Sequence, residues 1–504
     1  MVFQTLLGFD PPTLVIVAVT LLVILVVSSW TRTPANLPPC PVRPFPVLGH
    51  LAYMSKDPRG VIMDWSKQTG DIFSLYFGTT LVIVISGYDV LKETLVKQAD
   101  IFSDRPKTGM FPILKTFNGI INTSGPLWKE NRSTVLSILR TFGMGKNVMA
   151  EKIEEEVHAY LEEIKRLGGK PADIKEITCR AVSNVICNFL LGKRFEYNDS
   201  YYLKFLKMFD QTVASASAGS LHKWFPSVQY IPGDPFKTKQ VVVNRGAFDN
   251  FAQEFIEKVE DNETGGINRD NIIAYYLREM REKHDKGQST HLSDEGLMRV
   301  ISDFMIAGSE TTTSTILWFF LYMLHNPDVQ RKIHEEIDEE IGTDRNPKIT
   351  DRSKLTYVNA AIMETQRAAS IVPLGLFHTC IQETSVRGYT IPKDTLIMTH
   401  LDGVLLSEQL WGDPQNFRPE RFIDEKGNLQ SPDHFVAFSM GRRLCLGEAL
   451  AKAELFLFIT YTLQKYRVVP EDPDSLPPFD SILGITRAPK PHKLRLVKRD
   501  AAMD

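Results

Sequence analysis

The order of hydrophobic and polar residues divides the chain into an apolar N-terminal segment, a short proline-rich stretch and a long amphipathic body. Between Pro11 and Thr31 no residue is charged, and Leu14–Val27 is aliphatic except for Thr20. A run of this length crosses a hydrocarbon core about 30 Å thick. The segment has neither the basic start nor the small-residue cleavage site of a removable signal peptide, so residues 1–33 are predicted to form a retained transmembrane signal anchor.

The residues around this segment predict its orientation. Asp10 precedes it, whereas Arg32 and Arg43 follow it, and basic residues collect on the cytosolic side of a membrane. The N-terminus is therefore expected in the lumen and the body of the protein in the cytosol. Residues 34–50 contain six prolines, which exclude helix and favour a stiff extended hinge between anchor and body.

The body, residues 51–504, has no internal repeat and no change in composition that would mark a second domain. Alternating apolar residues predict a β-hairpin made of Ile72–Phe77, the turn Gly78–Thr80 and Leu81–Ile85. Helical spacing dominates from Tyr88 to about residue 340. Short strands are expected in Val386–Met398 and a final helix from about Leu446 to Gln464. The pattern predicts a single large domain that is mainly α with small β-sheets.

The composition of the chain excludes several classes of function. The 504-residue chain is 43% hydrophobic and 24% charged with a net charge of −3, which excludes a mainly disordered chain and gives no basic surface for nucleic acid. Its five cysteines are too few and too irregular for a disulfide scaffold, and no C-x-x-C pair supports a zinc ribbon. The sequence also lacks a P-loop, a dinucleotide-binding glycine motif and a nucleophile elbow. Electrons for any redox reaction must therefore come from another protein.

The segment Phe438–Gly447 holds the strongest candidate for chemistry. A lone cysteine is more often a small buried hydrophobe than a ligand. Here, however, Gly441 and Gly447 bracket Cys445 and leave room for a flat ligand, and the start of the predicted helix favours a thiolate. A thiolate is the axial ligand that promotes O–O cleavage at haem iron, and Arg443 could meet a haem propionate.

The spacing F-x-x-G-x-R-x-C-x-G in this segment resembles the haem-binding loop of the cytochrome P-450 family. Further family motifs occur in the expected order: W-x-x-x-R at Trp128–Arg132, the oxygen-activating stretch at Ala307–Thr312, E-x-x-R at Glu364–Arg367 and its partner at Pro419–Phe422. The resemblance extends from the apolar segment to about residue 498. It implies the cytochrome P-450 fold, a haem b with the Cys445 thiolate as axial ligand, and monooxygenation, in which one atom of O₂ enters the substrate and the other leaves as water.

The resemblance also implies roles for residues around the haem. Thr311 would be the hydrogen-bonding alcohol and Glu310 the acid of a proton relay. They lie in a polar stretch that long apolar flanks predict to be buried, with a kink at Gly308. A structural network would be formed by Glu364, Arg367 and Arg421. The residues that contact the haem would be Arg105, Trp128, Arg132, His378, Phe438, Gly441, Arg443 and Gly447.

A lipophilic substrate is expected, because the family positions that would line a pocket are mostly apolar and include no cationic clamp. These positions are Phe304, Ala307, Ile371, Val372, Leu374, Leu376, Ile482 and Leu483, with further contacts from Lys107–Ile121 and Phe205–Ser220. Fatty acids, steroids or secosteroids, and xenobiotics all remain open as substrates. Trp224–Ile231 is expected to expose bulky apolar side chains and to dip into the membrane beside a substrate entrance.

The resemblance implies that NADPH-cytochrome P-450 reductase, with cytochrome b5 as a second candidate, docks beside Cys445 on the cations Arg140, Lys146, Arg442 and Lys452. The alternative is that these four are ordinary scattered surface charges. Gly70–Leu75 and Gln98–Pro106 are similar to animal microsomal enzymes of the second family, which predicts the endoplasmic reticulum membrane, although Leu401–Leu406 departs from the family pattern. Two other functions stay open: a haem-thiolate isomerase or dehydratase that needs no O₂, and a non-catalytic haem or lipid binder.

Overall fold

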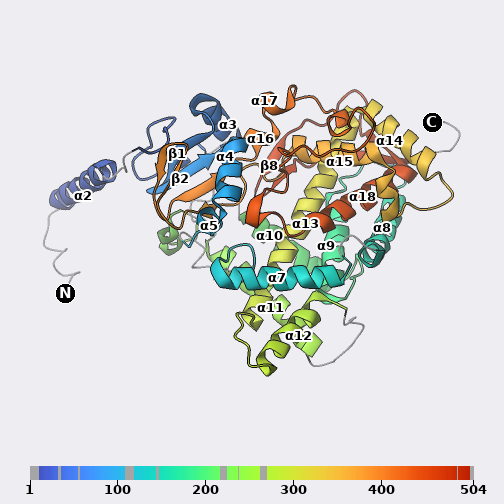
Figure 1. Ribbon diagram of the computed structural model, residues 1–504, viewed down its shortest axis with the longest axis horizontal. Helices are drawn as coiled ribbons and strands as arrows, with labels where there is room; N and C mark the ends of the chain where they lie inside the picture. Colours follow the sequence, from blue (N-terminus) through green and yellow to red (C-terminus); the bar gives the residue numbers. More distant parts are fainter. Residues whose placement is uncertain are drawn as a thin grey trace.

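The computed structural model describes residues 11–31, 36–54, 57–107, 118–143, 147–215, 224–235, 238–260, 270–484 and 486–499. Helices make up most of these residues, and a four-stranded sheet lies at one end of the body (Figure 1). This arrangement confirms the predicted mainly helical class with small sheets. Lys146 and parts of the loops Lys107–Ile121 and Phe205–Ser220 lie outside the described residues.

The N-terminal segment forms the helix α2 (Pro11–Thr31), which stands apart from the body in Figure 1. Several of its aliphatic side chains are exposed, namely Leu14, Val15, Ile16, Val17, Val19, Leu21, Val23 and Ile24. Within the described part of the chain, no helix combines the length and apolar character required to cross a membrane. The predicted helix is thus present, whereas the membrane span stays a prediction.

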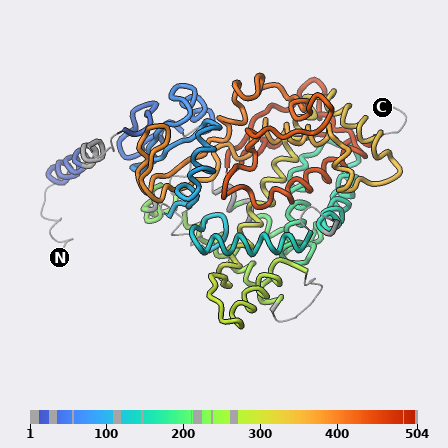
Figure 2. Tube along the Cα trace, in the orientation of Figure 1, coloured from blue at the N-terminus to red at the C-terminus, as the bar shows by residue number. Residues whose placement is uncertain are grey.

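The predicted hairpin is confirmed as the antiparallel strands β1 (Ile72–Phe77) and β2 (Thr80–Ile85). β2 pairs in parallel with β6 (Leu396–Thr399), and β6 pairs antiparallel with β3 (His378–Thr379), so the sheet order is β1-β2-β6-β3. Figure 2 shows the early part of the chain, in blue, beside the late part, in orange, at this sheet. The sheet thereby places His378 next to the N-terminal part of the chain.

Both faces of this sheet are covered, so its strands are buried almost throughout and show no exposed polar face. On one face, Phe73, Leu75, Val82 and Val84 pack with Ile62 and Trp65 of α3 (Pro58–Thr69). On the other face, Ile83 and Ile85 pack with residues of α4 (Tyr88–Lys92) and α5 (Ala99–Phe102). Apolar cover on both sides explains why Val and Ile fill these strands.

The helix α13 (Asp294–His325) runs through the main hydrophobic core and packs against α9 (Lys175–Leu191). Ser309 and Thr312–Thr315 are buried, as their apolar flanks predict. The helix is unbroken across Gly308, where a Cβ atom would lie 2.5 Å from Ile186 of α9. Gly308 therefore allows α9 to approach α13 closely.

The other large helices surround α13, and three small two-stranded sheets complete the body. The helices are α7 (Gly125–Thr141), α8 (Asn147–Leu167), α10 (Ser200–Ser215), α11 (Thr238–Glu260), α12 (Ile272–Asp285), α14 (Pro327–Glu340), α15 (Thr356–Ala369) and α18 (Glu448–Lys465). The small sheets are β4 (Thr384–Val386) with β5 (Tyr389–Ile391), β7 (Tyr466–Pro470) with β10 (Leu494–Lys498), and β8 (Ser481–Leu483) with β9 (Arg487–Pro489). The predicted late strands and the final helix are thus confirmed.

One prediction about the surface is wrong in part. Trp224 does not face outward, because its ring packs edge-on against Phe77 and Phe377, with centroids 4.7 and 5.6 Å away. Tyr230 and Ile231 at the end of the same segment are exposed, Tyr230 by 81%. Only this end of Trp224–Ile231 can therefore present apolar side chains to a membrane.

Candidate functional site

The loop that carries Cys445 is held by its own backbone and by a neighbouring helical turn. The Cys445 amide donates to the Phe438 carbonyl at 3.1 Å, and the Leu444 amide donates to the Gly441 carbonyl at 3.1 Å. Gly441 has φ +73°, and a Cβ atom there would lie 2.0 Å from the Leu95 carbonyl oxygen. Glycine at 441 is therefore required by the chain itself. Around Gly447, in contrast, no atom lies within 4 Å of the Cβ position, so space is left beside the cysteine.

Cys445 is accessible from a cleft of about 620 Å³, and protein surrounds it on the other sides. Burial raises the pKa of its thiol, although hydrogen bonds from the Gly447 and Glu448 amides and the charge of Arg132 lower it. The amides at the start of α18 therefore lower the thiol pKa as predicted, but burial raises it by more. A bound metal ion would deprotonate the thiol outright, so the thiolate depends on that ion.

A metal at Cys445 would also need ligands from outside the chain. Among the described residues, no group of three or more His, Cys, Asp or Glu side chains could hold a metal ion. One protein thiolate with four porphyrin nitrogens meets this condition. The remaining cysteines lie elsewhere: Cys179, Cys187 and Cys380 are buried, and Cys40 is exposed in the proline-rich stretch.

Three arginines gather beside the cysteine loop without an acidic partner. Arg105 donates from Nε to the Ile121 carbonyl at 3.0 Å and from Nη1 to the Phe377 carbonyl at 2.7 Å. Arg443 donates only to backbone carbonyls, those of Ser103, Ile120 and Thr123. Arg132 donates from Nη2 to the Leu444 carbonyl at 2.7 Å. No described carboxylate lies within ion-pair distance of these three guanidinium groups.

The electrostatics of this cluster show a site for an anion. Burial, and then the charge of Arg132, lowers the pKa of Arg105 to about 10. Burial, then Arg105, lowers the pKa of Arg443 to about 9, although the charge of Asp104, which is not within ion-pair distance, opposes this shift. Three cations that repel one another in a buried place need negative charge to balance them, which the two propionates of haem b would supply.

Trp128 adds a further donor to the same place, and His378 lies close to Arg105. The indole of Trp128 lies 3.9 Å from the Arg443 guanidinium, and its buried Nε1 has no hydrogen-bond partner in the described structure. Burial, then Arg105, lowers the pKa of His378 well below its usual value, so the ring is neutral. Its Nδ1 donates to the Phe102 carbonyl at 2.8 Å, so Nε2 of the neutral ring is an acceptor and could donate to a propionate only after the ring is protonated. The residues present thus fit haem b, and the predicted contact residues on distant segments come together.

Asp303 contributes to this site although it was not predicted. Its Oδ2 accepts hydrogen bonds from the Ile120 amide at 2.6 Å and the Ile121 amide at 2.9 Å. The carbonyls of these same residues accept from Arg443 and Arg105. Asp303 therefore ties α13 to the turn that orients both arginines. In the sequence, Asp303 is one of several charged residues in the first part of α13, so nothing there singles it out.

Glu310 and Thr311 occupy adjacent positions on α13, as predicted. The Thr311 hydroxyl donates to the Ala307 carbonyl at 2.7 Å. The Thr486 hydroxyl, which was not predicted, donates to Glu310 Oε1 at 3.1 Å. The Glu310 carboxylate and the Thr311 hydroxyl are therefore each held in a defined orientation on α13.

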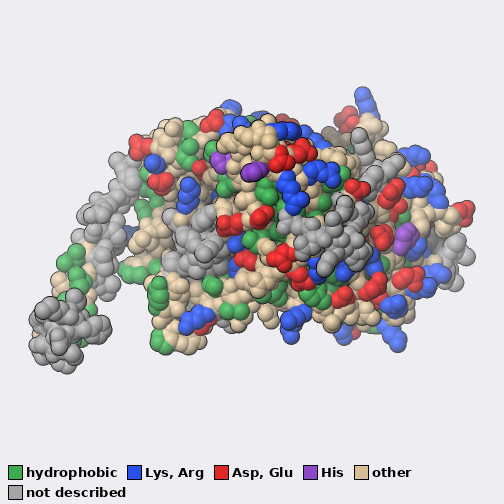
Figure 3. Space-filling view, turned by 90° about the horizontal axis from the view of Figure 1, so that it is seen from below, with side chains coloured by type: hydrophobic (Ala, Val, Ile, Leu, Met, Phe, Trp, Pro, Cys, Tyr) green, Lys and Arg blue, Asp and Glu red, His purple; other side chains and the backbone are tan. Residues whose placement is uncertain are grey.

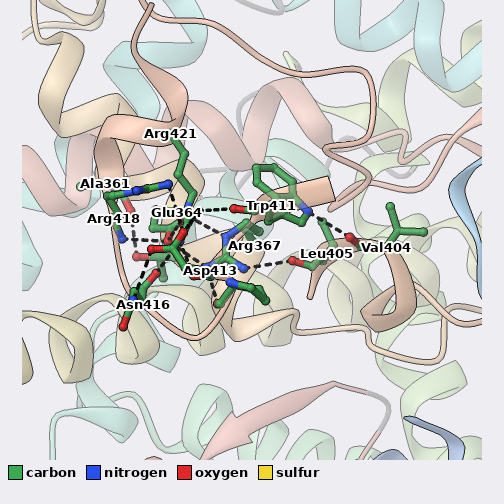
Figure 4. A network of polar contacts seen from close by, with 12 residues as sticks. Ala361, Glu364, Arg367, Val404, Leu405, Trp411, Asp413, Asn416, Arg418 and Arg421 are labelled. Atoms are coloured by element: carbon green, nitrogen blue, oxygen red, sulfur yellow. Dashed lines mark hydrogen bonds and ion pairs between the residues drawn. The ribbon is translucent and has the colours of Figure 1, made fainter. Parts of the chain in front are cut away.

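The predicted network of Glu364, Arg367 and Arg421 forms one buried cluster (Figure 4). Arg367 makes two parallel hydrogen bonds to the Glu364 carboxylate, at 2.7 and 2.8 Å. Arg421 Nε and the Arg418 amide donate to the same carboxylate at 3.2 and 2.8 Å. Arg367 also donates to the Leu405 carbonyl at 3.0 Å. All these contacts join protein to protein, so the cluster serves the fold.

The predicted pocket residues lie on three elements: α13, the segment after α15 and the β8–β9 hairpin. Phe304 and Ile371 pack against the main core, and Leu374 packs with the four-stranded sheet. Leu376 and Ile482 are exposed. Their convergence with Ala307, Val372 and Leu483 into one pocket stays a prediction.

Two of the predicted docking cations already have acidic partners. Arg442 pairs with Asp100, and Lys452 pairs with Glu448, each at 2.5 Å. Arg140 is exposed near the end of α7. It follows Leu136 by one helical turn and Arg132 by two turns, and both of these residues line the cleft at Cys445. Arg352 also lines this cleft and was not predicted. On the face drawn in Figure 3, positive and negative side chains are interspersed, which agrees with the net charge of −3.

Comparison with known proteins extends this picture to the whole body. The family model described as Cytochrome P450 matches residues 38–496. The chain is 35% identical to cytochrome P450 2U1 of Homo sapiens over 479 residues, which cover 94% of this chain and 84% of the relative. It is 36% identical to cytochrome P450 2C23 of Rattus norvegicus over 508 residues, which cover 98% and 100%. Cytochrome P450 2F3 of Capra hircus is 34% identical over 493 residues, which cover 96% and 98%.

The first test concerns the thiolate. Cys445→Ser should lose the red-shifted Soret band of the reduced carbon-monoxide complex, because a serine oxygen cannot replace the sulfur as donor to iron. Cys40→Ser is the matched control, and replacements of Cys179, Cys187 and Cys380 should also keep the band. The measurement is the absorbance difference spectrum of the purified variants. A normal band in Cys445→Ser would contradict the ligand assignment.

The second test concerns the buried network. Glu364→Gln removes the negative charge that two buried arginines share, so it should lower the free energy of unfolding by about 3 kcal/mol and reduce the haem-loaded fraction. Glu335→Gln breaks an exposed ion pair with Arg331 on α14 and should cost less than about 1 kcal/mol. Urea unfolding measures both. Equal losses in the two variants would show that the network is not essential to the fold.

Proposed function

The chain belongs to the cytochrome P450 family and is a haem-thiolate monooxygenase, and we propose that it oxidises a lipophilic substrate with electrons from NADPH-cytochrome P450 reductase. The observation that carries this proposal is the placement of Cys445 beside three arginines that lack acidic partners. The Glu310–Thr311 pair supports oxygen-dependent chemistry over the isomerase or dehydratase alternative, because those reactions need no proton delivery to oxygen.

Bound haem supplies an iron centre that activates O₂ for insertion into C–H or C=C bonds. Cys445 would hold this group through its thiolate, and Arg105, Arg132 and Arg443 would neutralise its propionates. On the other side, we assign Glu310 as the acid and Thr311 as the alcohol that delivers protons. The Thr311 Oγ1 proton points to the Ala307 carbonyl, so the hydroxyl must rotate before it donates elsewhere.

The substrate class follows from the residues assigned to the pocket. Phe304, Ile371, Leu374 and Ile482 are apolar, and none of the assigned positions is charged. Such a lining favours lipophilic molecules, because burial of their apolar surface drives binding. Fatty acids, steroids or secosteroids, and xenobiotics all satisfy this condition, and we propose no order among them.

Attachment to the endoplasmic reticulum membrane is part of the proposal, with the N-terminus in the lumen and the body in the cytosol. Two observations support it: the exposed aliphatic side chains of α2, and the exposed Tyr230 and Ile231 on the body. A lipid surface would cover both sets of side chains.

Electron delivery is proposed at the cleft beside Cys445. Arg132, Arg352 and Lys452 line it together with one acid, Glu448, and no residue of α13 lies among the lining residues. The cleft is therefore on the cysteine side of the site, where a cationic rim would attract an acidic reductase or cytochrome b5. Lys452 and Arg442 must first exchange their own acidic partners for those of the redox protein.

The proposed function and the proton relay are tested together. In a membrane system with reductase, NADPH and a candidate lipid, the protein should consume O₂ and NADPH and form an oxygenated product. Thr311→Ala should keep the carbon-monoxide spectrum but divert reducing equivalents to peroxide. The matched control is Thr365→Ala on α15, since Thr365 makes the same bond to a carbonyl four residues back.

The outcomes of that experiment separate the candidates. Product formed without O₂ or NADPH would favour the isomerase, and absence of any turnover or substrate-induced spin shift would favour a binding protein. Unchanged product per NADPH in Thr311→Ala would contradict the relay while leaving the monooxygenase intact.

The docking proposal is tested by Arg140→Glu. Arg140 is exposed and has no ion-pair partner among the described residues, so reversal of its charge should slow reductase-driven turnover and weaken the dependence of turnover on salt. Turnover driven by added peroxide needs no partner and should be unchanged. Lys204→Glu on α10 makes the same change of charge away from the cleft and serves as the control. Equal loss by the reductase and peroxide routes would place the damage in the haem site.

A further inference from the structure

A second buried glutamate lies between the helix after the cysteine loop and the helix of the proton relay. Glu454 of α18 is only 1% exposed, and its Oε2 accepts a hydrogen bond from the Thr312 hydroxyl of α13 at 3.0 Å. Its Oε1 is buried and has no hydrogen-bond partner within the described structure. Thr312 directly follows Thr311. The contact therefore joins the two helices that carry the opposite sides of the site.

From this geometry we propose that Glu454, in its uncharged form, is a positioning residue that holds Thr312 and thereby fixes the neighbouring Thr311 hydroxyl for proton delivery. The inference rests on the proposed role of Thr311. It goes beyond that role, because Glu454 is not among the residues assigned to the haem or to the pocket. It acts through the helix that carries the alcohol.

Comparison with Glu364 explains why this acid is uncharged. Both side chains are buried, but Glu364 is surrounded by two guanidinium groups, whereas Glu454 has a single neutral hydroxyl as donor. An ionised carboxylate with one neutral partner in a buried place is strongly disfavoured. Burial raises the pKa of Glu454 to about 8, against a small lowering by the Thr312 hydroxyl.

The charged groups on the helices around α18 act on other residues. Glu154 of α8 and Asp351, before α15, face Tyr461, and His158 of α8 lies edge-on to the same ring. On the other elements, His334 of α14 lies near Tyr466, Glu364 of α15 pairs with Arg367, and Glu310 of α13 bonds to Thr486. The pKa of the Glu454 carboxyl is raised by burial and lowered by the hydrogen bond from Thr312.

The consequence of ionisation follows from the same contact. A carboxylate at 454 would need water or a counter-ion between α18 and α13, and the helices would have to move apart to admit it. Such a movement would shift Thr312 and the adjacent Thr311. We therefore expect the coupling of NADPH use to product formation to fall as pH rises through about 8. About half of the molecules are ionised at the pKa and about nine-tenths one pH unit above it.

Stability should depend on the same proton. The unfolded chain releases this proton above its ordinary pKa of 4.5, whereas the folded chain keeps it up to about 8. Folding therefore becomes less favourable between these pH values and then levels off, because the unfolded state holds fewer protons in that window. Glutamine has the shape of the uncharged acid and does not titrate, so Glu454→Gln should lose this decline.

The experiment compares the holoenzyme with Glu454→Gln from pH 6 to pH 9, in the reconstituted system used for Thr311→Ala. The wild type should form a rising share of peroxide per NADPH above about pH 8, whereas Glu454→Gln should stay coupled to pH 9. Urea unfolding should show the variant gaining stability relative to the wild type from pH 5 to pH 8. Glu156→Gln is the matched control, since Glu156 is a buried carboxyl of α8 whose pKa burial raises to about 7. It should alter the stability profile but not the peroxide share.

The outcomes are distinguishable. If Glu454→Gln changes the stability profile but loses coupling with pH like the wild type, Glu454 is merely structural and the proposal is wrong. If Thr311→Ala itself stays coupled, the proposed relay fails first. Should Glu454→Gln not fold, Thr312→Val gives a second test: without the hydroxyl, peroxide formation should be high already at pH 7. A coupled Thr312→Val protein would overturn the proposal.

Discussion

The rest of the structure depends on the hydrogen bonds and ion pairs of the Glu364 carboxylate. It accepts two hydrogen bonds from Arg367, one from Arg421 and one from the Arg418 amide, all in the protein interior. The two arginines also donate to backbone carbonyls between Leu405 and Asn416, and Arg421 pairs with the Asp413 carboxylate at 2.6 Å. Removing the carboxylate would leave Arg367 buried without a counter-charge and Arg421 with Asp413 alone. One side chain thus fixes a long irregular segment that leads toward the cysteine loop.

Buried ionisable groups are neutralised in three different ways in this molecule. The Glu364 network is balanced within the protein, so it needs nothing from outside. Arg105 and Arg443 are held by carbonyls alone, and their balance depends on a bound anion. Glu454 has no counter-charge either, and its carboxyl is neutralised by a bound proton. The distribution of charge therefore distinguishes scaffold, cofactor site and positioning residue within one core.

The sequence predicted what local spacing determines. The hairpin, the final helix, the cysteine loop and the pairing of Glu364 with Arg367 all follow from residues close to one another in the chain. The pair Lys452–Glu448 also has helical spacing, so it could have been predicted before Lys452 was counted as a free cation. Asp303 and Thr486 could not be found in this way, because their partners lie on distant segments. Arg352 was missed because the cleft that it lines is formed by distant helices. The inward orientation of Trp224 likewise depends on Phe377, more than a hundred residues away.

The parallel pairing of β2 with β6 has a consequence for the order of assembly. The two strands are more than three hundred residues apart, and β3, which carries His378, joins the sheet only through β6. During synthesis, the edge of β2 that pairs with β6 therefore stays unpaired until most of the chain has left the ribosome. Arg105 and His378 come together only when that edge is closed, and Cys445 is made later still. Haem can therefore meet all of these residues only after most of the chain has been made.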